Sequence, residues 1–147
     1  KYLMNDLKVD GYLEAMKEAG LEPRVISVSG KTELNEVSYN EILKEEHPDV
    51  AIVVRDSMAV SFINVARLLH IHIPDDMQVI GFQNTRYAEL SRPKLTCVET
   101  PIYDIGEKAM NLLTKLMERE EETEEMPELK QYVDYSVIWR DSTKKEN

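Results

Sequence analysis

Two short apolar runs on either side of a helical pattern constrain the fold of this chain more than any other feature. Val50 to Val54 is continuously apolar, which is typical of a strand covered on both faces in a parallel sheet. A largely apolar helical segment follows from Met58 to Ile71, and Asp56 is placed to cap its first turn. Val79 to Phe82 is the next apolar run. A strand, a helix and a second strand predict an α/β fold with parallel strands and right-handed connections.

The rest of the sequence continues this alternation. Apolar residues at helical spacing predict a first helix that ends at Gly20 and a second that ends near His47. A further helix, from Ile102 to about Met117, begins after Thr100-Pro101, a capping residue followed by a proline. Short apolar or alternating runs predict further strands at Val25 to Val28, Leu95 to Val98 and Val133 to Trp139.

Composition excludes several classes of function. The chain is 42% hydrophobic and 31% charged, as in ordinary globular domains. Its net charge of −10 argues against direct binding of nucleic acid, and much of that charge lies between Glu118 and Glu128, a predicted solvated loop or helix end. No apolar run approaches the roughly 18 residues that span a bilayer. Cys97 is the single cysteine, so no intrachain disulfide is possible, and its apolar surroundings predict a buried, inert thiol in a reducing compartment.

Motifs for catalysis and cofactor binding are absent from the sequence. It contains no G-x-S-x-G elbow, no P-loop and no G-x-G-x-x-G. His70 and His72 could hold a metal in principle, but no cysteine or carboxylate cluster stands at ligand spacing. We interpret both as surface residues beside a helix C-terminus. The sequence therefore predicts no enzyme, no metal site and no cofactor.

Other motifs match those of a known protein family. Gly81 to Asn84 closes a predicted strand, Pro93 to Thr96 has the form Pro-x-Leu-Thr, and Arg140 to Thr143 has the form Arg-x-Ser-Thr. With these motifs the chain resembles the effector-binding domain of the lactose/galactose-repressor family of bacterial transcription regulators. The resemblance implies a periplasmic-binding-protein-like type I fold, a parallel sheet flanked by helices. The alternative is a secreted, periplasmic-type sugar-binding protein of a transport system, which has the same two-lobe fold but which the Arg-x-Ser-Thr ending disfavours.

The resemblance also implies how the chain is organised. Residues 1–94 and 129–144 would form the C-terminal lobe, residues 95–118 a strand and helix of the N-terminal lobe, and residues 118–128 an acidic loop. It implies a cytoplasmic homodimer that binds DNA through a head domain absent from these residues. In the family a central strand precedes the first helix, whereas this sequence opens on a helix. The chain would then be a fragment with unpaired strand edges, which predicts a swapped or otherwise self-associated arrangement.

The carboxyl ends of parallel strands are where such folds bind ligands. The resemblance places Lys8, Arg55 and Gln83 in the effector site, with Asp56 and Ile102 beside them. Family members commonly have Asn where Arg55 stands and Asp where Gln83 stands, so both differences shift the site toward positive charge. We therefore predict a sugar effector with an anionic group, such as a sugar phosphate, held by Lys8 and Arg55 while Gln83 binds a hydroxyl. The alternative is that Arg55 pairs with Asp56 or another carboxylate and the site is degenerate.

The helix that starts at Ile102 has a second implied role. In the family it helps to build the dimer, and in the catabolite-control branch it also helps to contact a phosphorylated phosphocarrier protein. Lys8 and Asn84-Thr85-Arg86 resemble that branch. The interface residues implied here are Tyr103, Asp104, Ile105 and Met110. Met110-Asn111 provides no arginine for a phosphoserine, which disfavours the phosphocarrier and leaves core packing of the helix as the alternative.

Overall fold

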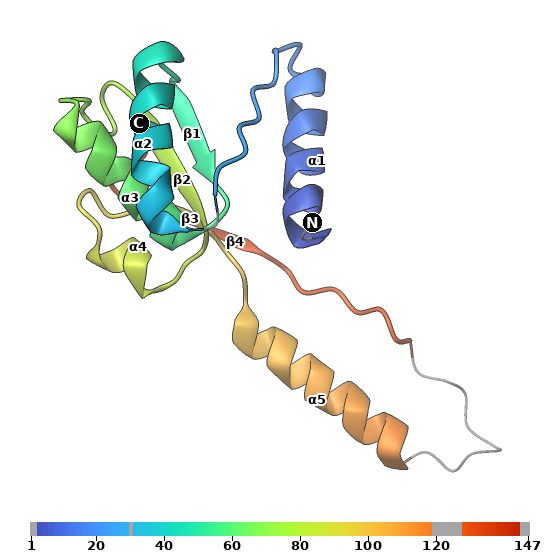
Figure 1. Ribbon diagram of the computed structural model, residues 1–147. Coiled ribbons are helices and arrows are strands. Elements are labelled where there is room, and N and C mark those ends of the chain that lie inside the picture. Colours follow the sequence, from blue (N-terminus) through green and yellow to red (C-terminus); the bar gives the residue numbers. More distant parts are fainter. Residues whose placement is uncertain (1–2, 30, 119–127, 145–147) are drawn as a thin grey trace.

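The computed structural model describes residues 3–29, 31–118 and 128–144, and these residues contain a four-stranded sheet (Figure 1). The strands, in spatial order, are β1 (Val50–Val53), β2 (Gln78–Gln83), β3 (Thr96–Glu99) and β4 (Ser136–Ile138). β1, β2 and β3 pair in parallel, and β4 joins β3 antiparallel. The predicted α/β fold is therefore confirmed, with an antiparallel strand at one edge.

Two helices pack together beside the sheet and enclose the core. α2 (Thr32–Glu45) contacts α3 (Asp56–Leu68), and α3 in turn contacts β1 and β2. Between the helices, Tyr39 and Phe62 meet edge to face with ring centroids 5.2 Å apart. A short helix, α4 (Arg86–Leu90), lies against α3. The most deeply buried apolar side chains are Leu43, Ala59, Ala66, Val79, Ala88, Leu95 and Cys97.

Two long helices stand away from this body (Figure 1). α1 (Leu3–Glu18) ends as predicted, because Gly20 takes a φ of +67° and the Leu21 amide donates to the Met16 carbonyl over 2.9 Å. α5 (Ile102–Glu118) projects from the other side, and none of its residues is buried. The predicted helix is confirmed, but its apolar face has no cover among the described residues.

The predicted strand at Val25 to Val28 is wrong. Residues 21–29 form neither helix nor strand, and Val25 and Ile26 are exposed. A strand needs a neighbour for its main-chain N–H and C=O groups. Among the described residues, β1 is at the edge of the sheet and pairs with β2 alone. The segment therefore has the composition of a strand but no partner.

The expectation that the Val50 to Val54 strand is covered on both faces is also wrong. Ala51 and Val53 pack against the core, but Val50 is 45% exposed and Ile52 is 49% exposed. α3 packs on β1, whereas α1 stands apart from it (Figure 1). The second face of β1 is thus bare in the part of the chain that the structure describes.

The end of the sequence is built into the sheet. β4 covers three residues of the predicted Val133 to Trp139 strand, and the chain then turns inward. The Ser142 hydroxyl donates to the Val79 carbonyl over 2.6 Å and accepts from the Thr96 amide over 2.8 Å. The Thr143 and Thr96 hydroxyls lie 2.8 Å apart. These bonds give the Arg-x-Ser-Thr ending a structural role in joining β2 to β3.

Two further predictions concern the acidic loop and membrane-spanning helices. The predicted acidic loop at 118–128 falls almost wholly on residues 119–127, which lie outside the described ranges. Within those ranges, no helix has the length and apolar character needed to cross a membrane.

Candidate functional site

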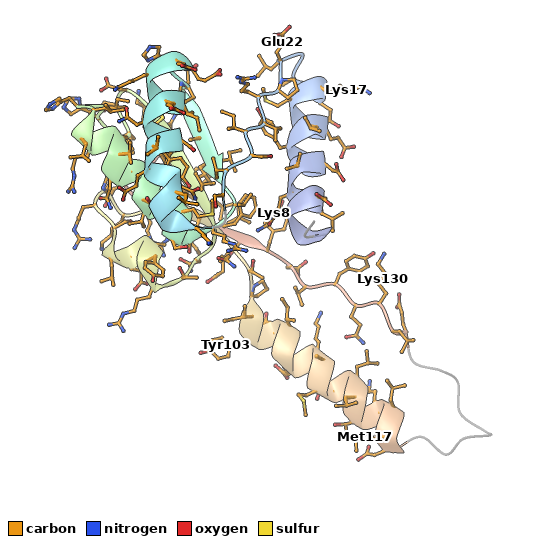
Figure 2. All side chains as sticks on the ribbon, in the orientation of Figure 1. Lys8, Lys17, Glu22, Tyr103, Met117 and Lys130 are labelled. Carbon is orange, nitrogen blue, oxygen red and sulfur yellow. The ribbon has the colours of Figure 1, made fainter. Side chains whose placement is uncertain are left out.

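The carboxyl edge of the sheet collects most of the predicted effector-site residues. Val53 of β1 lies opposite Gly81 of β2, so Arg55 and Gln83, each two residues further on, leave the sheet at the same edge. Lys8 reaches this edge from α1, and Figure 2 shows its position between that helix and the sheet. The Lys8 Nζ donates to the Val54 carbonyl over 3.2 Å. It also lies 4.7 Å from the centroid of the Phe82 ring, the residue before Gln83.

Lys8 and Arg55 place two positive charges at one edge. The pKa of Lys8 is lowered, first by partial burial and then by the positive charge of Arg55, while Asp56 opposes both effects. Arg55 is exposed, and within the described residues no ion pair with it is found. Repulsion between two cations favours any anion that binds beside both. The arrangement can therefore hold a carboxylate or a phosphate.

The Asp56 side chain points into the protein and forms no ion pair with Arg55. Its side chain is fully buried, with 0% exposure. The Oδ2 accepts hydrogen bonds from the Thr85 amide over 2.6 Å and from the Thr85 hydroxyl over 2.9 Å. The predicted capping role is wrong, because Arg55 is the residue at the helix cap and no side chain bonds the first turn of α3. Asp56 instead fixes the loop that follows β2.

The loop after β2 has an unusual backbone. Gln83 and Asn84 take positive φ values of 112° and 55°, which few residues other than glycine adopt. Gln83 is exposed, whereas Asn84 is half-buried. The Thr85 bonds to Asp56 hold the following residue. The turn therefore presents the Gln83 side chain outward, beside the two cations.

A hydrogen-bonded network behind this loop was not predicted. Asn84 Nδ2 donates to Glu99 over 2.8 Å, and Arg140 donates to Asn84 Oδ1 over 2.6 Å. Arg140 also donates to the Leu95 carbonyl over 2.7 Å, and the Ser136 hydroxyl donates to Glu99 over 2.9 Å. The Asn84 and Ser136 hydrogen bonds, helped by the charge of Arg140, lower the pKa of Glu99. Residues 84 and 140 are too far apart in sequence for any local pattern to pair them.

Beneath the site the packing is tight. Burial, followed by the charge of Asp56, raises the pKa of Cys97 to about 12, and its Sγ lies 3.4 Å from Asp56 Oδ1. The predicted buried thiol is confirmed, and a protonated thiol is a poor nucleophile. A methyl group on Gly81 would lie 2.7 Å from Asp56 Oδ1 and 2.7 Å from Leu95. Only glycine fits there, a constraint that the sequence did not reveal.

The remaining predicted site residues lie on α5. Ile102 is 68% exposed at the first residue of the helix, so its place in the effector site stays a prediction. Tyr103 is 88% exposed and projects from the helix (Figure 2). Asp104, Ile105 and Met110 are also exposed. All of these side chains are free to contact a partner, and their roles too remain predictions.

A separate cavity lies at the opposite end of the sheet. Its volume is about 180 Å³, and its lining includes His47, His70 and Met77. His72 is paired with Asp76, with Nδ1 and Oδ2 3.0 Å apart. Among the described residues no group of three His, Cys, Asp or Glu side chains could hold a metal ion. The cavity therefore offers no competing metal centre in this part of the chain.

Comparison with known proteins identifies the family. The family model of the periplasmic binding protein-like domain matches residues 4–143. The chain belongs to this family. Catabolite control protein A of Priestia megaterium is 38% identical over 117 residues, which are 77% of this chain and 35% of that protein. The HTH-type transcriptional regulator RegA of Clostridium acetobutylicum is 39% identical over 106 residues, 71% of this chain and 30% of that protein.

A solved structure gives the same result. The crystal structure of the transcription regulator CcpA of Lactococcus lactis superposes with a TM-score of 0.82 at 30% identity, over 97% of this chain and 52% of that one. The expected likeness to the effector-binding domain of lactose/galactose-repressor regulators is thus confirmed. These relatives are transcription regulators rather than enzymes or transport proteins. The chain spans about a third of the length of the curated relatives and about half that of the solved one.

Proposed function

We propose that this chain senses a small-molecule effector for a cytoplasmic bacterial transcription regulator. The observation that carries the proposal is the group of Lys8, Arg55 and the outward-facing Gln83 at the carboxyl edge of the sheet. Ligand binding at such an edge closes the domain and alters distant contacts, so effector and DNA affinity become linked reciprocally. With a net charge of −10, this stretch would leave DNA binding to another part of the protein.

The effector that we propose is an anionic metabolite of the sugar-phosphate class. Arg55 can bind a phosphate with two parallel hydrogen bonds, and Lys8 adds a point charge beside it. Burial is the main cause of the lowered pKa of Lys8, and the repulsion from Arg55 that adds to it is relieved when an anion binds. A neutral sugar gains little from either charge. Gln83 then provides an amide for a hydroxyl of the same ligand.

The test is calorimetric titration of the complete protein with glucose 6-phosphate, fructose 1,6-bisphosphate, glucose and fructose. We expect saturable binding of a phosphate and weaker or no binding of its neutral counterpart. The Arg55→Asn variant should lose about tenfold or more in affinity, as expected for one charged hydrogen-bonding partner. Arg67→Asn is the matched control, because Arg67 is an exposed arginine in the last turn of α3, far from the first.

Two outcomes would contradict parts of the proposal. Binding of neutral sugars alone would reject an anionic effector and leave the regulator in place. Binding of neither class would reject the small-molecule site and favour a protein co-effector.

We also propose that α5 is an interface in the homodimer of the complete protein. The observation in its favour is that no residue of this long helix is buried, although Tyr103, Ile105 and Met110 are apolar or aromatic. A phosphocarrier partner at the same helix is disfavoured, because Met110-Asn111 provides no cation for a phosphate.

A further inference from the structure

We propose that Asn84 couples the candidate effector site to the orientation of α5. Asn84 directly follows Gln83, and its side-chain amide bonds both strands that connect the body with that helix. It donates to Glu99, the last residue of β3, and accepts from Arg140, just after β4. The inference deepens the proposed function and rests on it for the identity of the site, but not for the coupling itself.

The first step is that the loop after β2 has a fixed shape. The Asp56 carboxylate binds the Thr85 amide and hydroxyl, and the positive φ values of Gln83 and Asn84 leave the backbone few alternatives. Because the loop holds its shape, a ligand that displaces Gln83 moves Asn84 with it. The displacement reaches the Asn84 amide directly, because the two residues share a peptide bond.

The second step is that the Asn84 amide contacts the chain both where it leaves the body toward α5 and where it returns. β3 leads out of the body to α5, and β4 is where the chain returns (Figure 1). Ser136, the first residue of β4, bonds the other oxygen of Glu99. Asn84, Glu99, Ser136 and Arg140 thus form a collar of four side chains around the strands that carry α5.

The third step is that the hydrogen bonds of Asn84 can be removed without breaking the other contacts of β3 and β4. Without the Asn84 amide, Arg140 keeps its bond to the Leu95 carbonyl and Glu99 keeps its bond to Ser136. β3 and β4 would therefore stay paired, as their ladder requires. What is lost is the brace between this pair of strands and the ligand-facing loop.

The test measures the distance between α3 and α5 by pulsed electron resonance in the complete protein. Spin labels are attached at Arg67→Cys and Lys115→Cys, with any cysteine outside this chain replaced by serine. Cys97 is buried and protonated, so it does not compete for the label. The variant is Asn84→Gly, which permits the positive φ while removing the amide. We expect it to broaden the distance distribution about twofold without ligand, since a brace on the moving strands is gone.

The matched control is Asn64→Gly. Asn64 is exposed on α3, so this variant also introduces a glycine and lowers stability, but it leaves the collar intact. Its distribution should keep the width of the parent. A rescue pair adds a second control: Asn84→Asp alone sets a carboxylate against Glu99 and should broaden the distribution. Adding Glu99→Gln supplies a new amide donor and should restore the width.

The outcomes separate the coupling from the identity of the ligand. If Asn84→Gly keeps the width of the parent, or if the rescue pair fails to restore it, the coupling is rejected. With glucose 6-phosphate, the parent should shift its mean distance and Asn84→Gly should not. A parent that responds to neither glucose 6-phosphate nor fructose 1,6-bisphosphate would reject the anionic effector, while the ligand-free widths would still decide the role of Asn84.

Discussion

Gly81 sets the spacing of the candidate site at the scale of one residue. It lies on β2 with Asp56, Leu95 and Cys97 around its α-carbon, and an added methyl group would meet two of them at 2.7 Å. The buried carboxylate of Asp56 can therefore reach Thr85 only because this residue has no side chain. A small change here would disturb the loop that carries Gln83.

Replacing Gly81 by alanine should destabilise the protein. We expect Gly81→Ala to lower the free energy of unfolding by about 1–3 kcal/mol, the usual cost of overpacking a filled core. In a urea titration this loss of stability appears as a lower unfolding midpoint, with the dependence of the free energy on urea concentration unchanged. Gly11→Ala is the control, and it should raise the urea midpoint, because alanine is more favourable than glycine within a helix. Gly11 lies within α1, and nothing lies within 4 Å of the added methyl group. An equal or higher midpoint for Gly81→Ala would show that the core can accommodate the methyl group.

The sequence predicted which residues gather at the site but not how each is used. The family resemblance placed Lys8, Arg55 and Gln83 at the site, and the strand pattern supports Arg55 and Gln83, because residues after parallel strands share an edge. Asp56 was assigned to the cap of its own helix, the local option, and tertiary structure gave it Thr85 instead. The Asn84 amide bonds Arg140, and no spacing rule reaches that far.

At the scale of elements, an ionised carboxylate adds to the contacts that join β3 and β4. Hydrogen bonds from Asn84 and Ser136 lower the pKa of Glu99 below its ordinary value of 4.5. A lowered pKa in the folded state means that the charged form stabilises the fold. This stabilisation is complete above the ordinary pKa and is lost as the pH falls through the lowered one. Acid should therefore weaken the join between the body and α5.

Glu99→Gln isolates this contribution. We expect the difference in unfolding free energy between the parent and the variant to be largest near pH 7. It should shrink as the pH falls from about 4.5 through the lowered pKa of Glu99, below which Glu99 itself is neutral. Chemical unfolding at a series of pH values measures it. Glu107→Gln on exposed α5 serves as the control for a simple change of net charge. If the difference in unfolding free energy stays constant down to pH 3, the charge of Glu99 does not stabilise the fold.

Elements were predictable where their partners lie within the described chain. β2 and β3 were predicted from apolar runs, and both are strands in the parallel part of the sheet. Residues 25–28 have an equally strong pattern but no neighbouring strand, so composition alone did not make them a strand. The bare face of β1 has the same origin. Local sequence reports what a segment can form, whereas pairing decides what it does form.

At the scale of the whole molecule, uncovered apolar surface should drive association. In the described residues β1 has an open edge and a bare face with Val50 and Ile52, and α5 exposes Tyr103, Met110 and Leu113. Unpaired edges and bare helix faces are templates for a second copy. We therefore expect the chain of residues 1–147 to form dimers or larger species at micromolar concentrations, as the swapped arrangement predicts.

Sedimentation velocity measures this association. Ile52→Lys should weaken it, because a lysine on an edge strand opposes pairing with another chain. Lys94→Arg, an exposed substitution that keeps the charge, should leave the sedimentation coefficient unchanged. A strictly monomeric parent would contradict the prediction.

Ser142 imposes an order on the folding of this protein during its synthesis. Its backbone carbonyl and hydroxyl accept the amide protons of Val79 and Thr96, which belong to segments translated long before it. A ribosome must therefore pass Thr143 before the two parallel strands complete their hydrogen bonds. A nascent chain that stalls earlier contains all residues of the candidate effector site, but these two amides lack their native acceptors.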